Sequence, residues 1–98
     1  MTPPTPAPAT LNDWQRWLRE YGERRWGKHD DNNSPYALQL KLYEECGEVI
    51  FANRPAQCLA ELGDVLVVVL RLIDALGGDA EAVIRDTAKK LMARVEEA

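Results

Sequence analysis

The chain has 98 residues, of which 46% are hydrophobic, and its formal net charge is −4. This length allows one small domain with a modest core, and we expect neither a membrane span nor an export signal, because no sufficiently long apolar run is present. No basic stripe dominates this acidic chain, which argues against general nucleic-acid binding. We therefore expect a cytoplasmic domain with no membrane and no nucleic-acid partner.

The first residues predict a tail followed by a helix. Residues 1–9 contain four prolines, which is typical of a disordered, proline-rich segment. Thr10 then offers a helix cap, and a helix is predicted over about residues 11–25. Its apolar residues recur at helical spacing: Leu11, Trp14, Trp17, Leu18 and Tyr21. Residues 10–98 are expected to form one all-α domain.

Three further helices are expected. A polar loop over residues 28–33 leads to Ser34-Pro35, a cap followed by proline at the first helical position. The second helix is predicted over about residues 35–52 and the third over about residues 55–76. Because their connection is short, the two should be antiparallel neighbours. A fourth helix is predicted to begin at Asp79.

Two pairs of carboxylates are the most informative feature of the sequence. Glu45 and Glu48 share a face of the second helix, and Glu61 and Asp64 share a face of the third. Each pair lies about two turns from the short connection, so the pairs should come level when the chain folds back. The apolar run over residues 65–70 predicts a helix in the middle of a bundle, with the carboxylates at the edge of its core.

Four converging carboxylates repel one another unless a cation lies between them. Ligand sets made only of oxygen suit Mg²⁺ or Mn²⁺, and magnesium usually keeps positions open for water and substrate phosphate. The cluster therefore predicts one or two such ions that await a phosphorylated ligand. No serine or cysteine nucleophile with a base partner is evident, and Cys46 and Cys58 are expected to be free, core-facing thiols.

The segments that carry these carboxylates match a family pattern. Residues 41–48 read K-L-Y-E-E-C-G-E and residues 60–66 read A-E-L-G-D-V-L. This resembles the E-E-x-x-E and E-x-x-D signature of the MazG-like nucleoside triphosphate pyrophosphohydrolases of the all-α NTP pyrophosphatase superfamily. The resemblance covers about residues 11–96. It implies a four-helix MazG-like bundle completed by homo-oligomerisation, as a homodimer or homotetramer. It also implies Mg²⁺-dependent hydrolysis of a (d)NTP to a monophosphate and pyrophosphate, as house-cleaning of deoxynucleotides or aberrant nucleotides.

The resemblance also implies roles for the individual carboxylates. Carried over position by position, Glu45, Glu48, Glu61 and Asp64 would be the magnesium ligands. Glu44 would either support the metal ligands without binding the ion itself or accept the proton of the attacking water. Glu44 and Glu45 are therefore placed together in the catalytic set.

Basic and aromatic residues complete the predicted site. Lys89, Lys90 and Arg94 resemble the phosphate-facing residues of the family's last helix, although they could also be solvated cations favoured by the helix dipole. Trp26 resembles the tryptophan that stacks on a nucleobase in related deoxynucleotide triphosphatases, with a core anchor as the alternative. His29, the only histidine, lies in a polar loop and is assigned no role.

Two other functions stay open at this point. Phosphoribosyl-ATP pyrophosphohydrolases have similar acidic helices but tend to carry a histidine soon after the second acidic pair, where this chain has the apolar residues 65–70. A non-catalytic helical oligomerisation module could use the cluster for a structural ion. The presence of all four carboxylates speaks against the second of these.

Overall fold

The computed structural model describes residues 6–97, and every regular element among them is helical. The elements follow in the order α1 (Leu11–Trp26), a short 3₁₀ helix η1 (Asp31–Asn33), α2 (Pro35–Ile50), α3 (Pro55–Ala75) and α4 (Ala80–Glu97). The prediction of an all-α chain is therefore confirmed. The predicted tail over residues 1–9 lies partly outside the described residues and stays a prediction.

Side-chain caps explain where the first two long helices begin. The Thr10 hydroxyl accepts a hydrogen bond from the backbone N–H of Asp13 at 3.1 Å. The Ser34 hydroxyl accepts one from the backbone N–H of Ala37 at 3.2 Å, and Pro35 is the first residue of α2. Each cap satisfies a backbone donor that has no partner within its own helix.

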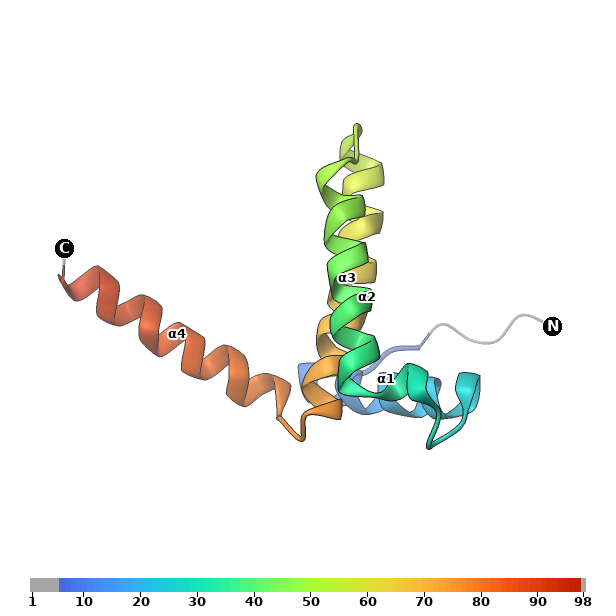
Figure 1. The fold of residues 1–98 in the computed structure, drawn as a ribbon. Helices are drawn as coiled ribbons and strands as arrows, with labels where there is room; N and C mark the ends of the chain where they lie inside the picture. Colours follow the sequence, from blue (N-terminus) through green and yellow to red (C-terminus); the bar gives the residue numbers. More distant parts are fainter. Residues whose placement is uncertain (1–5, 98) are drawn as a thin grey trace.

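The helices form a hairpin that stands on a crossing helix (Figure 1). α2 and α3 run antiparallel along their length, and α1 lies across the base of this hairpin. The buried core is small and lies at that base, where Leu18 of α1, Leu70 of α3 and Ala80 of α4 meet. Trp14 and Ile73 pack against these three residues. α4 contacts the rest of the chain near its beginning and then extends away from the hairpin.

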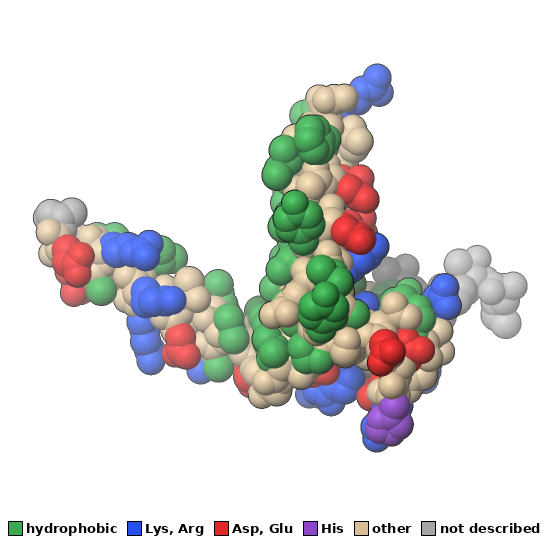
Figure 2. Space-filling view, viewed as in Figure 1, with side chains coloured by type: hydrophobic (Ala, Val, Ile, Leu, Met, Phe, Trp, Pro, Cys, Tyr) green, Lys and Arg blue, Asp and Glu red, His purple; other side chains and the backbone are tan. Residues whose placement is uncertain are grey.

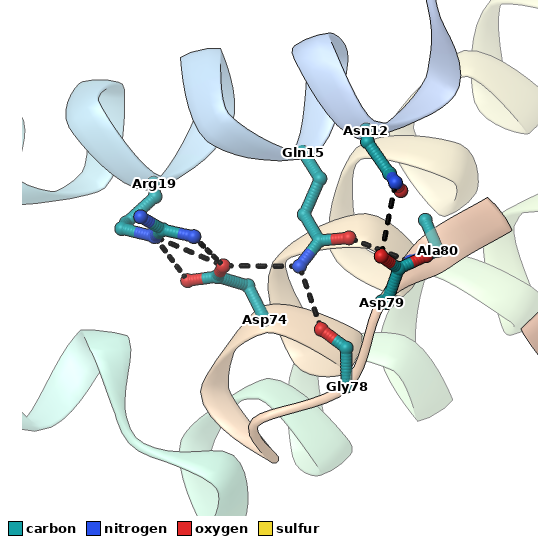
Figure 3. Close-up of polar contacts among 7 residues, drawn as sticks. All are labelled: Asn12, Gln15, Arg19, Asp74, Gly78, Asp79 and Ala80. Carbon is teal, nitrogen blue, oxygen red and sulfur yellow. Dashed lines mark hydrogen bonds and ion pairs between the residues drawn. The ribbon is translucent and has the colours of Figure 1, made fainter. Parts of the chain in front are cut away.

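A polar clamp fixes the direction in which α4 leaves the base (Figure 3). Gln15, which is 6% exposed, accepts a hydrogen bond from the backbone N–H of Ala80 at 2.8 Å. Its amide nitrogen donates to the carbonyl of Gly78 at 2.9 Å and to the carboxylate of Asp74 at 3.1 Å. Arg19 pairs with the same carboxylate at 2.7 Å. The start of α4 is thus held to both α1 and α3.

Much apolar surface stays uncovered because α4 does not fold back over the hairpin. Figure 2 shows apolar side chains along one side of the hairpin and acidic side chains along the opposite edge. The run over residues 65–70, predicted to lie in the middle of a bundle, is only partly covered within one chain. Val68 and Leu70 are buried, but Leu66 is 62% exposed. No helix in the described part of the chain is long and apolar enough to cross a membrane.

The prediction of core-facing cysteines is also wrong for one of the two residues. Cys46 is exposed, whereas Cys58 is half-buried, and both are free thiols. Cys46 directly follows the buried Glu45 on α2. Adjacent helical residues point about 100° apart, since a turn holds 3.6 residues, so Cys46 cannot share the inward direction of Glu45.

Candidate metal centre

The structure brings the four predicted metal ligands together. Glu45 and Glu48 come from α2, and Glu61 and Asp64 come from α3. Each residue offers one carboxylate oxygen, and these oxygens all lie within 4.8 Å of one another. The two pairs meet because the hairpin turn is short and both pairs lie a similar distance from it. The cluster is therefore a direct product of the spacing along the chain.

Burial within the cluster is uneven. Glu45 is only 6% exposed, while Glu48 and Asp64 are exposed and Glu61 is half-buried. Lys41, one turn before Glu45 on the same helix, reaches its Oε1 atom with Nζ at 3.1 Å. That hydrogen bond is the main reason why the pKa of Lys41 lies above its ordinary value. The Glu45 carboxylate is thus already paired with the positively charged side chain of Lys41.

The described residues do not balance the remaining negative charge of the cluster. The Oε2 atoms of Glu45 and Glu61 are buried and have no hydrogen-bond partner among the described residues. The pKa of Glu61 is raised, first by a hydrogen bond with Glu48, then by burial, and then by the negative charges of Glu48, Asp64 and Glu45. A buried acceptor without a donor is costly, so this arrangement favours a bound cation.

The donor set decides which kind of cation fits. All four groups are carboxylates, which suit hard divalent ions such as Mg²⁺ and Mn²⁺. Two of the four are exposed, so an ion held here could keep positions for water and for a ligand. The residues present therefore fit a divalent metal centre that is open on one side.

A cavity of about 410 Å³ adjoins the cluster. Its lining includes Trp26, Leu38, Leu40, Lys41, Glu44 and Arg71. Glu44 is exposed and lies 3.6 Å from Lys41 Nζ, so the lysine contacts carboxylates both in the cavity and in the cluster. Lys41 therefore links the cavity to the cluster, although none of the four cluster carboxylates lines the cavity.

Trp26 stands at the end of a row of aromatic side chains on α1. The Trp17 and Tyr21 rings are stacked with centroids 6.0 Å apart, and Tyr21 meets the Trp26 ring edge-on at 6.0 Å. Trp14 packs against the core at the other end of the row, whereas Trp17 is 37% exposed. Trp26 is half-buried and lines the cavity, so it lies where a flat ligand group could reach it.

Sequence reasoning missed Arg71, which contacts Trp26. Its Cζ atom lies 4.6 Å from the Trp26 ring centroid, and its side chain lines the same cavity. One signal could have identified it. Arg71 is a charged residue directly after the apolar run of α3, seven residues after Asp64 and so on the same face of the helix.

The three predicted phosphate-binding residues do not join the site within one chain. Lys89, Lys90 and Arg94 are exposed on the part of α4 that extends away from the hairpin (Figure 1). Lys89 pairs at 3.9 Å with Asp86, one turn earlier on the same helix. His29 is exposed in the loop after α1 and acquires no role.

The fold is thus an antiparallel helical hairpin that carries a cluster of four carboxylates on its edge. Residues 33–98 match the family model of the MazG nucleotide pyrophosphohydrolase domain, and the chain belongs to this family. The match includes α2, α3 and all four carboxylates, and the predicted resemblance is thereby confirmed. It does not include α1, where Trp26 lies. No curated protein matches the chain. Family membership implies nucleotide pyrophosphohydrolase activity in general.

Proposed function

We propose that the protein is a metal-dependent nucleoside triphosphate pyrophosphohydrolase, which converts a (d)NTP and water to a (d)NMP and pyrophosphate. One observation carries the proposal, namely the four-carboxylate cluster, with two buried oxygens that have no partner among the described residues, beside a cavity that ends at Trp26. A cytoplasmic house-cleaning role, directed at deoxynucleotides or aberrant nucleotides, belongs to the same proposal.

The metal ligands in this proposal are Glu45, Glu48, Glu61 and Asp64, holding Mg²⁺ or Mn²⁺. When bound, such ions neutralise triphosphate charge and make the attacking water more acidic. Glu45 also serves in the catalytic set, because Lys41 holds its Oε1 atom at 3.1 Å and thereby orients the carboxylate.

Glu44 is proposed to accept the proton of the attacking water. It is exposed, lines the cavity and lies beside the cluster without belonging to it. The water oxygen forms a bond to phosphorus while the anhydride bond between the α and β phosphates breaks, and the bonding electrons leave with pyrophosphate. The water proton passes to the Glu44 carboxylate. Lys41 contacts both Glu44 and Glu45 and so positions the two carboxylates relative to each other.

Trp26 is proposed to stack on the nucleobase. The ring is half-buried and lines the cavity, which supports a contact with the ligand over a role purely in the core. Stacking on an aromatic ring contributes about 1–3 kcal/mol per base and tolerates any base, since every base has a π face. Selectivity among bases would need a polar group in addition.

We propose that the protein is a homo-oligomer, a dimer or a tetramer, in which α4 covers a second copy. The exposed apolar residues of the hairpin and of α4 form the surface that such an assembly would bury. They include Tyr43, Ile50, Phe51, Leu59, Leu66, Ile84, Leu91, Met92 and Val95. An exposed apolar surface of this extent is typical of an interface. In the assembly, Lys89, Lys90 and Arg94 of one copy would reach phosphates bound by the acidic cluster of another.

Pyrophosphate release tests the proposal. The purified protein is incubated with a panel of ribonucleoside and deoxyribonucleoside triphosphates and with phosphoribosyl-ATP, with and without Mg²⁺. We expect Mg²⁺-dependent release of pyrophosphate from at least one nucleoside triphosphate. Release from phosphoribosyl-ATP alone would identify a phosphoribosyl-ATP pyrophosphohydrolase instead. Metal binding without turnover of any compound would instead identify the protein as a non-catalytic helical oligomerisation module.

A further inference from the structure

We propose that Arg71 determines which nucleobases the cavity accepts, favouring bases that carry a carbonyl oxygen and rejecting adenine. The inference rests on the proposed function, because it assigns the cavity to the nucleoside part of the substrate. It adds a selective polar contact to the unselective stacking surface of Trp26.

The guanidinium group of Arg71 is held in place by its neighbours. Its Nη2 atom donates to the side-chain oxygen of Asn33 at 2.6 Å and to the carbonyl of Asn32 at 3.3 Å. The amide nitrogen of Asn33 in turn donates to the carbonyls of Gly27 at 2.8 Å and Gly22 at 3.2 Å. The loop that follows α1 therefore anchors one end of the guanidinium.

The close packing of α1 against this network shows that the arrangement is built into the fold. A Cβ atom at Gly22 would lie 2.6 Å from the side-chain oxygen of Asn33 and 3.2 Å from Nη2 of Arg71. Gly22 is buried. Any larger residue there would displace Asn33 or Arg71, so the absence of a side chain at Gly22 makes room for their hydrogen bond.

The anchored group lies at the end of the cavity where a base is expected. Arg71 Cζ is 4.6 Å from the centroid of the Trp26 ring, within the range of a cation–π contact. Along α3, Arg71 lies two turns beyond Asp64 on the same face, about 10 Å along the helix axis. That separation leaves room for a sugar between a phosphate at the cluster and a base at Trp26.

Arg71 has donors to offer to a ligand. Among the described residues its hydrogen bonds come from Nη2 alone, and no carboxylate forms a salt bridge with it. The side chain is half-buried, and this desolvation lowers the pKa of the guanidinium below its ordinary value. Because a guanidinium carries five N–H donors and no acceptor, the uncommitted donors favour a ligand group that accepts hydrogen bonds.

The common bases differ in the hydrogen-bond acceptors that they present. Guanine, cytosine, uracil and thymine each carry an exocyclic carbonyl oxygen. Adenine has no such oxygen and accepts only at its ring nitrogens. Its N1 and N7 atoms both lie beside the amino group, so a forked guanidinium that donates to either nitrogen would place its second donor against a donor. A mismatch of this kind leaves buried polar groups unpaired and discriminates more strongly than the shape of an apolar pocket does. Arg71 therefore selects against adenine nucleotides.

The test compares Arg71→Met with Arg25→Met. Arg25 is the matched control, because its Cζ lies 5.4 Å from the same Trp26 ring but the side chain is exposed and does not line the cavity. We measure kcat/KM for dATP, dGTP and dCTP, and also the binding of the three monophosphates by calorimetry, which does not depend on turnover. Circular dichroism checks that each variant is folded.

We expect the wild-type protein and Arg25→Met to prefer dGTP and dCTP over dATP by about tenfold or more, equivalent to one well-placed charged hydrogen bond. In Arg71→Met this preference should fall to within about twofold, and Arg71→Lys, which keeps a donor but not the planar fork, should be intermediate. A wild-type protein without this preference overturns the inference whether or not Arg71→Met folds, and so does a preference that survives in Arg71→Met.

The two proposals fail in different ways. Selective binding of the monophosphates without hydrolysis of any triphosphate would overturn the proposed enzyme activity and support the role of Arg71. Hydrolysis of all three triphosphates at similar efficiency would support the enzyme and overturn the role of Arg71. If the protein neither binds the monophosphates nor hydrolyses the triphosphates, both proposals are overturned.

Discussion

The exchange Glu48→Gln tests the electrostatics of the cluster, because it removes one negative charge and keeps the size of the side chain. The Glu45 and Glu48 oxygens lie within 4.8 Å of each other. Two unit charges at this distance repel by about 3.5 kcal/mol at an effective dielectric of about 20 and by about 0.9 kcal/mol in water. Glu48 is exposed, so the lower value applies, and we expect the metal-free variant to be about 1 kcal/mol more stable than the wild type.

For a domain of this size, 1 kcal/mol raises Tm by about 4 °C or more. We measure Tm by differential scanning fluorimetry in EDTA and in Mg²⁺, and pyrophosphate release in Mg²⁺. In EDTA the Tm of Glu48→Gln should lie above that of the wild type, the rise caused by Mg²⁺ should shrink or vanish, and turnover should fall by about 100-fold or more.

Glu44→Gln provides the control for Glu48→Gln. Glu44 lies on the same helix and is exposed, but it stands outside the cluster and only pairs with Lys41 at 3.6 Å. Exposed ion pairs contribute about 0–1 kcal/mol, so its Tm in EDTA and its Mg²⁺-induced rise should stay close to those of the wild type, although turnover falls. The reasoning is refuted if Glu48→Gln is less stable than the wild type in EDTA and still gains the full Mg²⁺-induced rise.

Three further predictions concern the clamp and the cavity. Burial alone would raise the pKa of Asp74, but hydrogen bonds from Arg19 and Gln15 lower it below the ordinary value of 3.8. The ionised carboxylate therefore stabilises the fold above pH 3.8, and this contribution is lost as the pH falls through the lowered pKa. In acid titrations followed by circular dichroism, the wild type should lose more stability than Asp74→Asn. Gln15→Leu leaves the backbone N–H of Ala80 without its acceptor, which should cost about 1–3 kcal/mol in urea unfolding; an unchanged midpoint would show that the clamp does not stabilise the fold. Trp26→Ala should raise KM more than it lowers kcat, and an unchanged KM would argue that the ring does not contact the substrate.

The elements of the fold that could be predicted from the sequence are those encoded locally. Thr10 and Ser34 act as caps because their side chains bond to backbone groups three residues away, and the predicted helix boundaries lie within two residues of the observed ones. The meeting of the carboxylates follows from the same local information, since helical spacing and a short turn together bring Glu45 near Glu61.

The direction of α4 could not be predicted in the same way. Its apolar residues indicate a face that packs against something, but not what it packs against. The direction depends on Gln15, which bonds to Gly78 and Ala80 across more than sixty residues of sequence. Such contacts leave no periodic signal. The same holds for Arg71, whose contacts with Asn33 and Trp26 depend on how the loop after α1 folds against α3.

The proposed chemistry depends on a divalent cation held by the four carboxylates between α2 and α3. Crystals of the protein grown with Mn²⁺, measured at a wavelength where manganese scatters anomalously, would locate such an ion. We expect an anomalous peak among the carboxylates of Glu45, Glu48, Glu61 and Asp64. A map without a peak there, with these side chains turned apart into solvent at saturating Mn²⁺, would contradict it.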